Sequence, residues 1–272
     1  MPHITIGDLR LHYQTAGSPA APPLLIISGI SDTLYKCEWQ VPELAKDFYI
    51  IYFDNRSAGL SDHPADHYGI VEMADDASAL LQALDITSAH VFGFSMGGMI
   101  ALNLVLHDPD RVNRLILGCT TAGGPLATPP EPEVITALTN PVRCGDRYQD
   151  FLNGMEISLS PEFIRQQPEM IHRLADMATV NPQSDQAYLS QLQAILTHNV
   201  AKRLKEIRKP VLVLHGTADR LIPPENGRAL AEHISGAELI LYADAGHMFF
   251  VEQAAKVNRD IREFLTTSKT TF

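Results

Sequence analysis

The chain has 272 residues, which is enough for one large α/β domain with an insertion or for two small domains. Hydrophobic residues make up 45% of the chain and charged residues 19%, as in a soluble globular protein rather than a disordered one. The formal net charge of −11 argues against nucleic acid and against anionic membranes as partners, because both bind clustered Lys and Arg.

The three cysteines, Cys37, Cys119 and Cys144, are widely spaced and form no CxxC motif. Their spacing predicts neither a metal site nor a disulfide framework, and it favours a reducing compartment. The first fifteen residues show no cationic region followed by an apolar core, so no signal peptide is expected. The apolar runs are too short to span a bilayer, and we therefore expect a cytoplasmic protein.

The chain opens with residues that alternate between apolar and polar. Residues 3–6 and 9–14 flank the pair Gly7-Asp8, which predicts a β-hairpin with a two-residue turn.

Short, almost purely apolar runs then alternate with helical patterns. Strands that are apolar on both faces are covered on both faces, as in a mostly parallel sheet flanked by helices. Apolar residues recur at helical spacing over residues 73–84 and 254–265, and residues 96–106 are apolar nearly all round. The predicted strands are LLIIS (24–28), YIIYF (49–53), HVFGF (90–94), RLILG (114–118), VLVLHG (211–216) and ELILY (238–242).

The alternation has one long break, because no strand pattern occurs between residue 118 and Val211. Glycines and prolines at 122–133 cannot continue a helix or a central strand, whereas 161–178 and 185–197 carry helical patterns. We therefore predict an α/β core domain made of residues 1–119 and 206–272. Residues 120–205 are predicted to form a helical cap over the C-terminal edge of the sheet.

The sequence Gly-Phe-Ser-Met-Gly at 93–97 lies between a predicted strand and a predicted helix. A G-x-S-x-G motif in this context places Ser95 on a sharp turn above the sheet edge, as a nucleophile. The turn also directs the first free N–H groups of the helix toward a developing oxyanion. The alternative is a glycine-rich packing turn that carries an inert serine.

A serine hydroxyl needs a base, and histidine is the usual one because it titrates near neutral pH. His247 follows a predicted strand and precedes the last helix, so it is the candidate base. His215 also ends a strand, but we interpret it as structural. We expect His63 and His67 to lie in a solvated loop.

The base needs a carboxylate that fixes its tautomer. Asp219 follows the strand at 211–216, and the order Ser95, Asp219, His247 is the one expected of an α/β hydrolase. Asp244 is a rival, but it lies only three residues before His247 and is more typical of a turn.

With these residues the chain resembles the α/β-hydrolase family, whose fold is a mostly parallel sheet flanked by helices with a helical cap insertion. Residues 53–62, FDNRSAGLSD, look like the family's D-x-R-G-x-G-x-S loop, with Ser57 in place of a glycine. We interpret Asp54 and Arg56 as structural residues of this loop.

The resemblance also implies an oxyanion hole. The family has a His-Gly pair after its first core strand, where this chain has Ser28-Gly29. The resemblance assigns the two donors to the backbone N–H groups of Ile30 and Met96. There is no HGGG sequence, so the lipase-type loop is absent.

Within the family, GFSMGGMIALNL looks most like small bacterial carboxylesterases, enol-lactonases and pimeloyl-ester-type hydrolases. The family's cap would roof the site and supply an apolar pocket. The alternative is that these apolar side chains only form the core of the cap. The pocket candidates are Phe151, Met155, Phe163, Met170 and Met177.

The expected function is hydrolysis of carboxylic esters with small or medium apolar groups, through an acyl-enzyme and with neither a cofactor nor a metal. The expected partner is a small-molecule ester or lactone, and the expected state is a monomer or homodimer.

Lactone opening, perhydrolysis and C–C bond hydrolysis on the same triad are alternatives. Phe94 and Met248 do not match the usual C–C hydrolase pattern. Haloalkane dehalogenases and epoxide hydrolases carry aspartate where this chain has Ser95. A non-catalytic ligand receptor on this fold is a further alternative.

Overall fold

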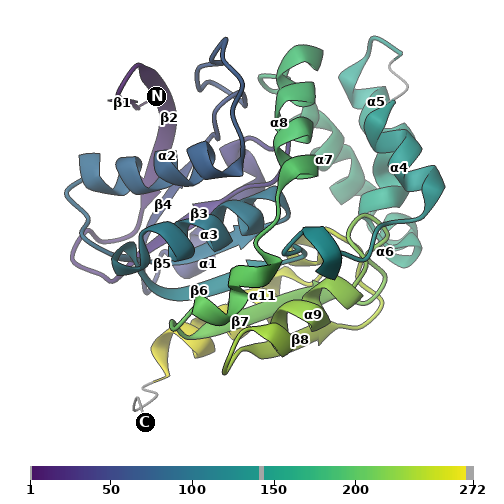
Figure 1. Ribbon diagram of the computed structural model, residues 1–272. Helices are drawn as coiled ribbons and strands as arrows, with labels where there is room; N and C mark the ends of the chain where they lie inside the picture. The colour runs from purple at the N-terminus through teal and green to yellow at the C-terminus, as the bar shows by residue number, and fades with distance from the viewer. Residues whose placement is uncertain (1, 141–143, 268–272) are drawn as a thin grey trace.

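The computed structural model describes residues 2–140 and 144–267. Its centre is an eight-stranded sheet with the order β1-β2-β4-β3-β5-β6-β7-β8 (Figure 1). β1 pairs antiparallel with β2 and β2 with β4, while the six strands from β4 to β8 in that order are parallel. The strands are β1 His3–Ile6, β2 Leu9–Ala16, β3 Pro23–Ile27, β4 Tyr49–Phe53, β5 Ala89–Phe94, β6 Val112–Gly118, β7 Val211–Gly216 and β8 Glu238–Tyr242.

The helices around the sheet bury one core on each of its faces. Successive side chains of a strand point to opposite faces, so Leu25 and Ile27 of β3 enter one core while Leu24 and Ile26 enter the other. The first core is closed by α2, α3 and α9, and the second by α1, α10 and α11. These helices are α1 Val41–Leu44, α2 Ile70–Ala83, α3 Met96–His107, α9 Glu225–His233, α10 Phe249–Glu252 and α11 Ala254–Thr266. None of the described helices is long and apolar enough to cross a membrane.

Five further helices lie in the interval predicted for the cap and gather on one side of the molecule (Figure 1). Side chains cap three of them: Asp146 accepts a hydrogen bond from the Tyr148 N–H, Ser160 from the Phe163 N–H, and Ser184 from the Ala187 N–H. The helices are α4 Pro132–Thr139, α5 Arg147–Ser158, α6 Pro161–Gln166, α7 Pro168–Thr179 and α8 Asp185–Thr197. The division of the chain into core and cap domains stays a prediction.

The helical pattern over residues 161–178 is divided between two helices, α6 and α7. The first helix, α6, ends before Gln167, whose φ of −125° and ψ of 54° are not helical, and α7 begins at Pro168. Proline excludes the helical conformation at the residue before it and has no N–H for a helical hydrogen bond.

Candidate active site

Ser95 lies between β5 and α3, in a backbone conformation that residues with a side chain rarely adopt. Its φ of 56° and ψ of −125° cost about 1–3 kcal/mol for a residue with a side chain. A Cβ on Gly93 would come within 2.1 Å of the Gly97 carbonyl oxygen, and a Cβ on Gly97 within 2.0 Å of the Ile27 carbonyl oxygen. Only glycine fits at either position. The Ser95 N–H donates to the Gly118 carbonyl at 2.9 Å, which ties the turn to the end of β6.

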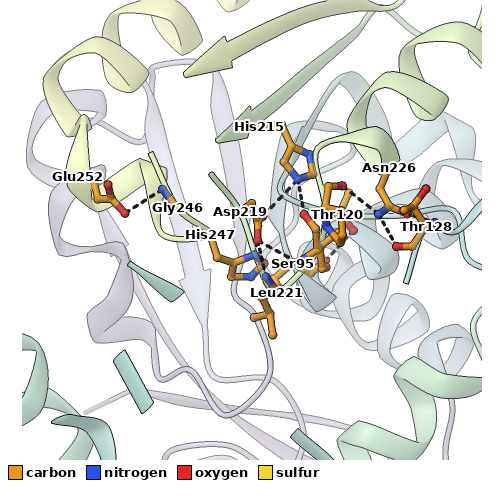
Figure 2. Close-up of polar contacts among 12 residues, drawn as sticks. Ser95, Thr120, Thr128, His215, Asp219, Leu221, Asn226, Gly246, His247 and Glu252 are labelled. Carbon is orange, nitrogen blue, oxygen red and sulfur yellow. Dashed lines mark hydrogen bonds and ion pairs between the residues drawn. The ribbon is translucent and has the colours of Figure 1, made fainter. Parts of the chain in front are cut away.

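His247 and Asp219 come from the loops after β8 and β7 and meet beside Ser95 (Figure 2). The Nδ1 atom of His247 lies 2.8 Å from Oδ2 of Asp219, and both side chains are buried. The other carboxylate oxygen, Oδ1, accepts hydrogen bonds from the N–H groups of Leu221 and Ile222, each at 2.9 Å. The carboxylate is therefore fixed in place and orients the imidazole.

The two groups shift each other's pKa. Burial acts to raise the pKa of Asp219, but His247 and His215 outweigh it and hold the pKa at about 2. Burial acts to lower the pKa of His247, but the Asp219 carboxylate outweighs it and holds the pKa well above its ordinary value. The carboxylate stays ionised at neutral pH and favours a proton on the imidazole.

Asp244, the rival carboxylate, lies in an exposed turn. Its side chain is exposed, its φ of 59° is left-handed, and its N–H donates to the Thr217 hydroxyl at 2.9 Å. The structure thus places Asp219 against His247 and Asp244 in a turn.

The loop after β3 approaches Ser95 closely, because a Cβ on Gly29 would lie 3.6 Å from the Ser95 hydroxyl oxygen. Within the described residues, the N–H groups of Ile30 and Met96 donate to no protein acceptor. The Met96 N–H is the first of α3 and carries the positive end of its dipole. The Asn55 amide donates to the Ser28 carbonyl at 3.0 Å and holds this loop in the absence of the family's histidine.

Three further residues lie beside Ser95, Asp219 and His247. The sequence alone leads to a structural interpretation of His215 and does not single out Cys119 or Thr120 as part of the site. The His215 Nε2 atom lies 3.2 Å from Oδ2 of Asp219 and 2.8 Å from the Ile222 carbonyl, so this buried ring supports the acid. Thr120 donates its hydroxyl to the Ser95 carbonyl at 2.8 Å, and the buried Cys119 thiol lies against His247. Their only sequence signal is their position at or just after the end of a predicted strand.

Glu252 of α10 joins the loop of His247 to the cap. Its Oε1 accepts the N–H of Gly246 at 3.0 Å and the N–H of Ser160 at 2.9 Å. Its Oε2 accepts the Ser160 hydroxyl at 2.6 Å, at the N-terminus of α6. This carboxylate thus fixes the loop of His247 relative to the N-terminus of α6.

A second carboxyl, that of Asp32, also lies beside the site. Its Oδ2 would be 2.9 Å from a Cβ on Gly29. Burial raises the pKa of Asp32 above its ordinary value, although Lys36, His247 and the Gly29 N–H each act to lower it. The Lys36 ammonium also lies 5.3 Å from the ring centre of Phe151 in the cap.

The apolar cap residues have mixed positions. Phe151, Met155, Phe163 and Met170 are partly buried and pack against the core that α1, α10 and α11 close. Met177 is half-buried on α7. This packing suits the alternative reading of cap core, and the role of these residues in a substrate pocket stays a prediction.

Comparison with known proteins agrees with this architecture. A family model described as "alpha/beta hydrolase fold" matches residues 22–254. The chain is 29% identical over 259 residues to 3-oxoadipate enol-lactonase 2 of Acinetobacter baylyi, covering 95% of this chain and 94% of that protein. It is 32% identical over 253 residues to the poly(3-hydroxyalkanoate) depolymerase of Ectopseudomonas oleovorans, covering 92% of this chain and 86% of that protein.

A solved structure has the same fold over nearly the whole chain. The enol-lactonase from Burkholderia xenovorans matches with a TM-score of 0.85 at 26% identity, covering 98% of this chain and 100% of that one. Together with the eight-stranded, mostly parallel sheet and the serine turn between β5 and α3, these matches show that the chain belongs to the α/β-hydrolase fold family.

Proposed function

We propose that the protein is a serine hydrolase that cleaves carboxylic esters. One observation carries the proposal: the buried His247–Asp219 pair, joined at 2.8 Å, lies next to a serine held on a strained strand-to-helix turn. A buried acid–base pair beside an activated hydroxyl is the arrangement that acyl transfer requires.

In the proposed reaction, Ser95 attacks the ester carbonyl while His247 takes its proton. The free N–H groups of Ile30 and Met96 receive the oxyanion. His247 then protonates the leaving alcohol, and a water molecule activated by the same ring releases the acid. Asp219 stabilises the imidazolium throughout.

Lactones are the second candidate substrate class. A lactone is a cyclic ester, so its opening uses the same steps and leaves the alcohol attached to the released acid. The likeness to two enol-lactonases, one by sequence and one by structure, supports this candidate. The likeness to a polyester depolymerase supports open-chain esters instead.

The test is turnover of short p-nitrophenyl esters and of simple lactones by the parent protein and by Ser95→Ala. The variant should lose about 10⁶-fold in kcat, the order found for the serine of a protease triad. Ser57→Ala is a control, because it removes a different serine hydroxyl, one that contacts a histidine ring, His63 Nδ1, at 2.7 Å.

Ser57→Ala should keep parent activity, and a fluorophosphonate should label Ser95 alone. An active Ser95→Ala variant would refute the proposal, and so would label on a different serine. Binding of these compounds without turnover would favour the non-catalytic receptor.

A further inference from the structure

Three side chains that can ligate a metal meet at the base of the site. One ligand atom each from Cys119, Asp219 and His247 lies within 4.8 Å of the other two, and all three residues are buried. They follow the neighbouring strands β6, β7 and β8, so they are far apart in sequence and form no spacing motif. The mechanism proposed for the hydrolase uses Asp219 and His247 but leaves Cys119 without a role.

The spacing suits a tetrahedral ion. With Zn–S near 2.3 Å and Zn–N or Zn–O near 2.0 Å, neighbouring ligand atoms lie about 3.3–3.5 Å apart. Nδ1 of His247 and Oδ2 of Asp219 are 2.8 Å apart, so this pair opens by about half an ångström around such an ion.

Two of the ligands are already held by the backbone. The Cys119 N–H donates to the Leu214 carbonyl at 2.9 Å, and its φ of 37° fixes the direction of the side chain. The Asp219 carboxylate is held through its other oxygen by two N–H groups. Such a site needs little ordering when an ion enters.

The charges also balance. A divalent ion bound by the Cys119 thiolate, the Asp219 carboxylate and a neutral His247 ring forms a cluster with no net charge, and burial penalises a neutral cluster least. The thiol proton and the second proton of the His247 ring, which Asp219 favours in the metal-free protein, both leave as the ion enters. A thiolate and an imidazole select Zn²⁺ over Mg²⁺ and Ca²⁺, which prefer oxygen ligands.

We propose that Cys119, Asp219 and His247 form an inhibitory site for Zn²⁺. The inhibition rests on the proposed function. A ring that binds Zn²⁺ through Nδ1 carries its proton on Nε2 and cannot accept one from Ser95. A ring that binds through Nε2 has no free lone pair there. Either way the ion removes the general base.

The first experiment is titration of metal-free protein with Zn²⁺ during hydrolysis of a p-nitrophenyl ester. The rates of each variant are divided by its own metal-free rate. Zn²⁺ should inhibit the parent, and Mg²⁺ should not. Cys119→Ala should raise the half-inhibiting Zn²⁺ concentration by at least about tenfold, the lower end of what loss of even an outer partner costs in metal affinity. Cys144→Ala is the matched control, because it removes an exposed thiol and should leave the inhibition unchanged.

The second experiment measures binding without turnover. Co²⁺ added to Ser95→Ala should give a thiolate-to-cobalt absorption band, which Cys119→Ala combined with Ser95→Ala should abolish. Cys119→Ser serves as a second variant of similar volume, and circular dichroism checks that each one is folded. A cobalt band in Ser95→Ala, together with a parent protein that shows no esterase activity, would support the metal site while the proposed function fails.

Equal inhibition of the parent and of folded Cys119 variants would overturn the inhibitory site. A cobalt band that survives in the Cys119 variants but disappears in Cys144→Ala would also overturn it, because the metal would then bind at the exposed thiol.

Discussion

Asp219 faces four donors, two on each carboxylate oxygen. The N–H groups of Leu221 and Ile222 reach Oδ1, while His247 and His215 reach Oδ2. At the scale of the residue, this crowding keeps the acid ionised inside the protein and fixes which side of the imidazole carries a proton. The same arrangement makes the acid the most informative residue to change.

Asp219→Asn should keep the fold and lose about 10⁴-fold in kcat, the order known for this change in a protease triad. The amide disfavours the productive tautomer of His247 and withdraws support from the imidazolium. Asp244→Asn is the control, and its turnover on the same short ester should stay near that of the parent. A crippled Asp244→Asn beside an active Asp219→Asn would mean that the acid is misassigned.

The pH dependence of the parent follows from the raised pKa of His247. Only the neutral ring accepts the proton of Ser95, so kcat/KM should rise with pH as His247 deprotonates. Because Asp219 raises that pKa, the midpoint of the rise should lie above 6.5, the ordinary value for histidine. In Asp219→Asn the residual activity should show its midpoint at lower pH. A midpoint that does not move between the two proteins would contradict this coupling.

The three residues proposed as the triad could be singled out from the sequence because each has a local signal. Ser95 lies in a glycine motif, and Asp219 and His247 follow strands in the expected order. Cys119 and Thr120 have only their position just after a predicted strand, because they reach the site through the pairing of β6 with β5 and β7. Glu252 likewise acts through contacts with Ser160, which is distant in sequence.

At the scale of the element, two glycines in helices have opposite roles. Gly97→Ala would push a Cβ into the Ile27 carbonyl and should prevent correct folding or strongly lower the melting temperature. Gly154 lies exposed in α5 with no atom within 4 Å of an added Cβ, so Gly154→Ala should raise the free energy of unfolding by about 1 kcal/mol. Denaturant unfolding of both variants checks this. Equal changes in the free energy of unfolding for the two variants would show that the turn after β5 is not crowded.

Glu252 connects α10 to the N-terminus of α6 and to the loop of His247. Glu252→Ala removes the acceptor of three hydrogen bonds and should lower the free energy of unfolding by about 1.5–3 kcal/mol. It should also lower kcat, because the loop of His247 loses its anchor. Glu252→Gln retains an acceptor for both N–H groups and can donate to Ser160, so its free energy of unfolding and its kcat should fall much less. If Glu252→Ala keeps parental stability and kcat, the anchor has no role.

The strands were easier to predict than the cap helices. Every predicted strand is present, because buried parallel strands are continuous apolar runs. Helices α4 and α5 were not predicted, since neither buries a regular apolar stripe and Gly154 weakens the pattern of α5. Pro168 divides the helical pattern between α6 and α7, and it could have been read as a helix start.

At the scale of the whole molecule, the order of strands could not be read from the sequence. β3 lies between β4 and β5, and this pairing is set by contacts across the chain rather than by local pattern. The order matters for function, because β5, β6, β7 and β8 are successive neighbours whose C-terminal ends carry Ser95, Cys119, Asp219 and His247. The site is therefore a product of the sheet's assembly.

Two apolar side chains of the predicted cap are expected to influence substrate preference. Met155→Ala and Phe163→Ala should change the preference for acyl-chain length more than they change turnover of the smallest esters. The reason is that their side chains are only partly buried on the side of the molecule where the cap helices gather. Rates across a series of p-nitrophenyl esters, with circular dichroism, check this. If both variants unfold, these residues are cap core and the pocket assignment is wrong.

The steric constraints around the serine turn determine which of its positions can change during evolution. The steric demands fall on Gly93 and Gly97, where only glycine fits, whereas position 95 already accommodates a side chain. A lineage can therefore exchange the reactive atom at position 95 without rebuilding the scaffold that presents it. Diversification of this architecture is expected to conserve the two glycines more strictly than the chemical identity of the residue between them.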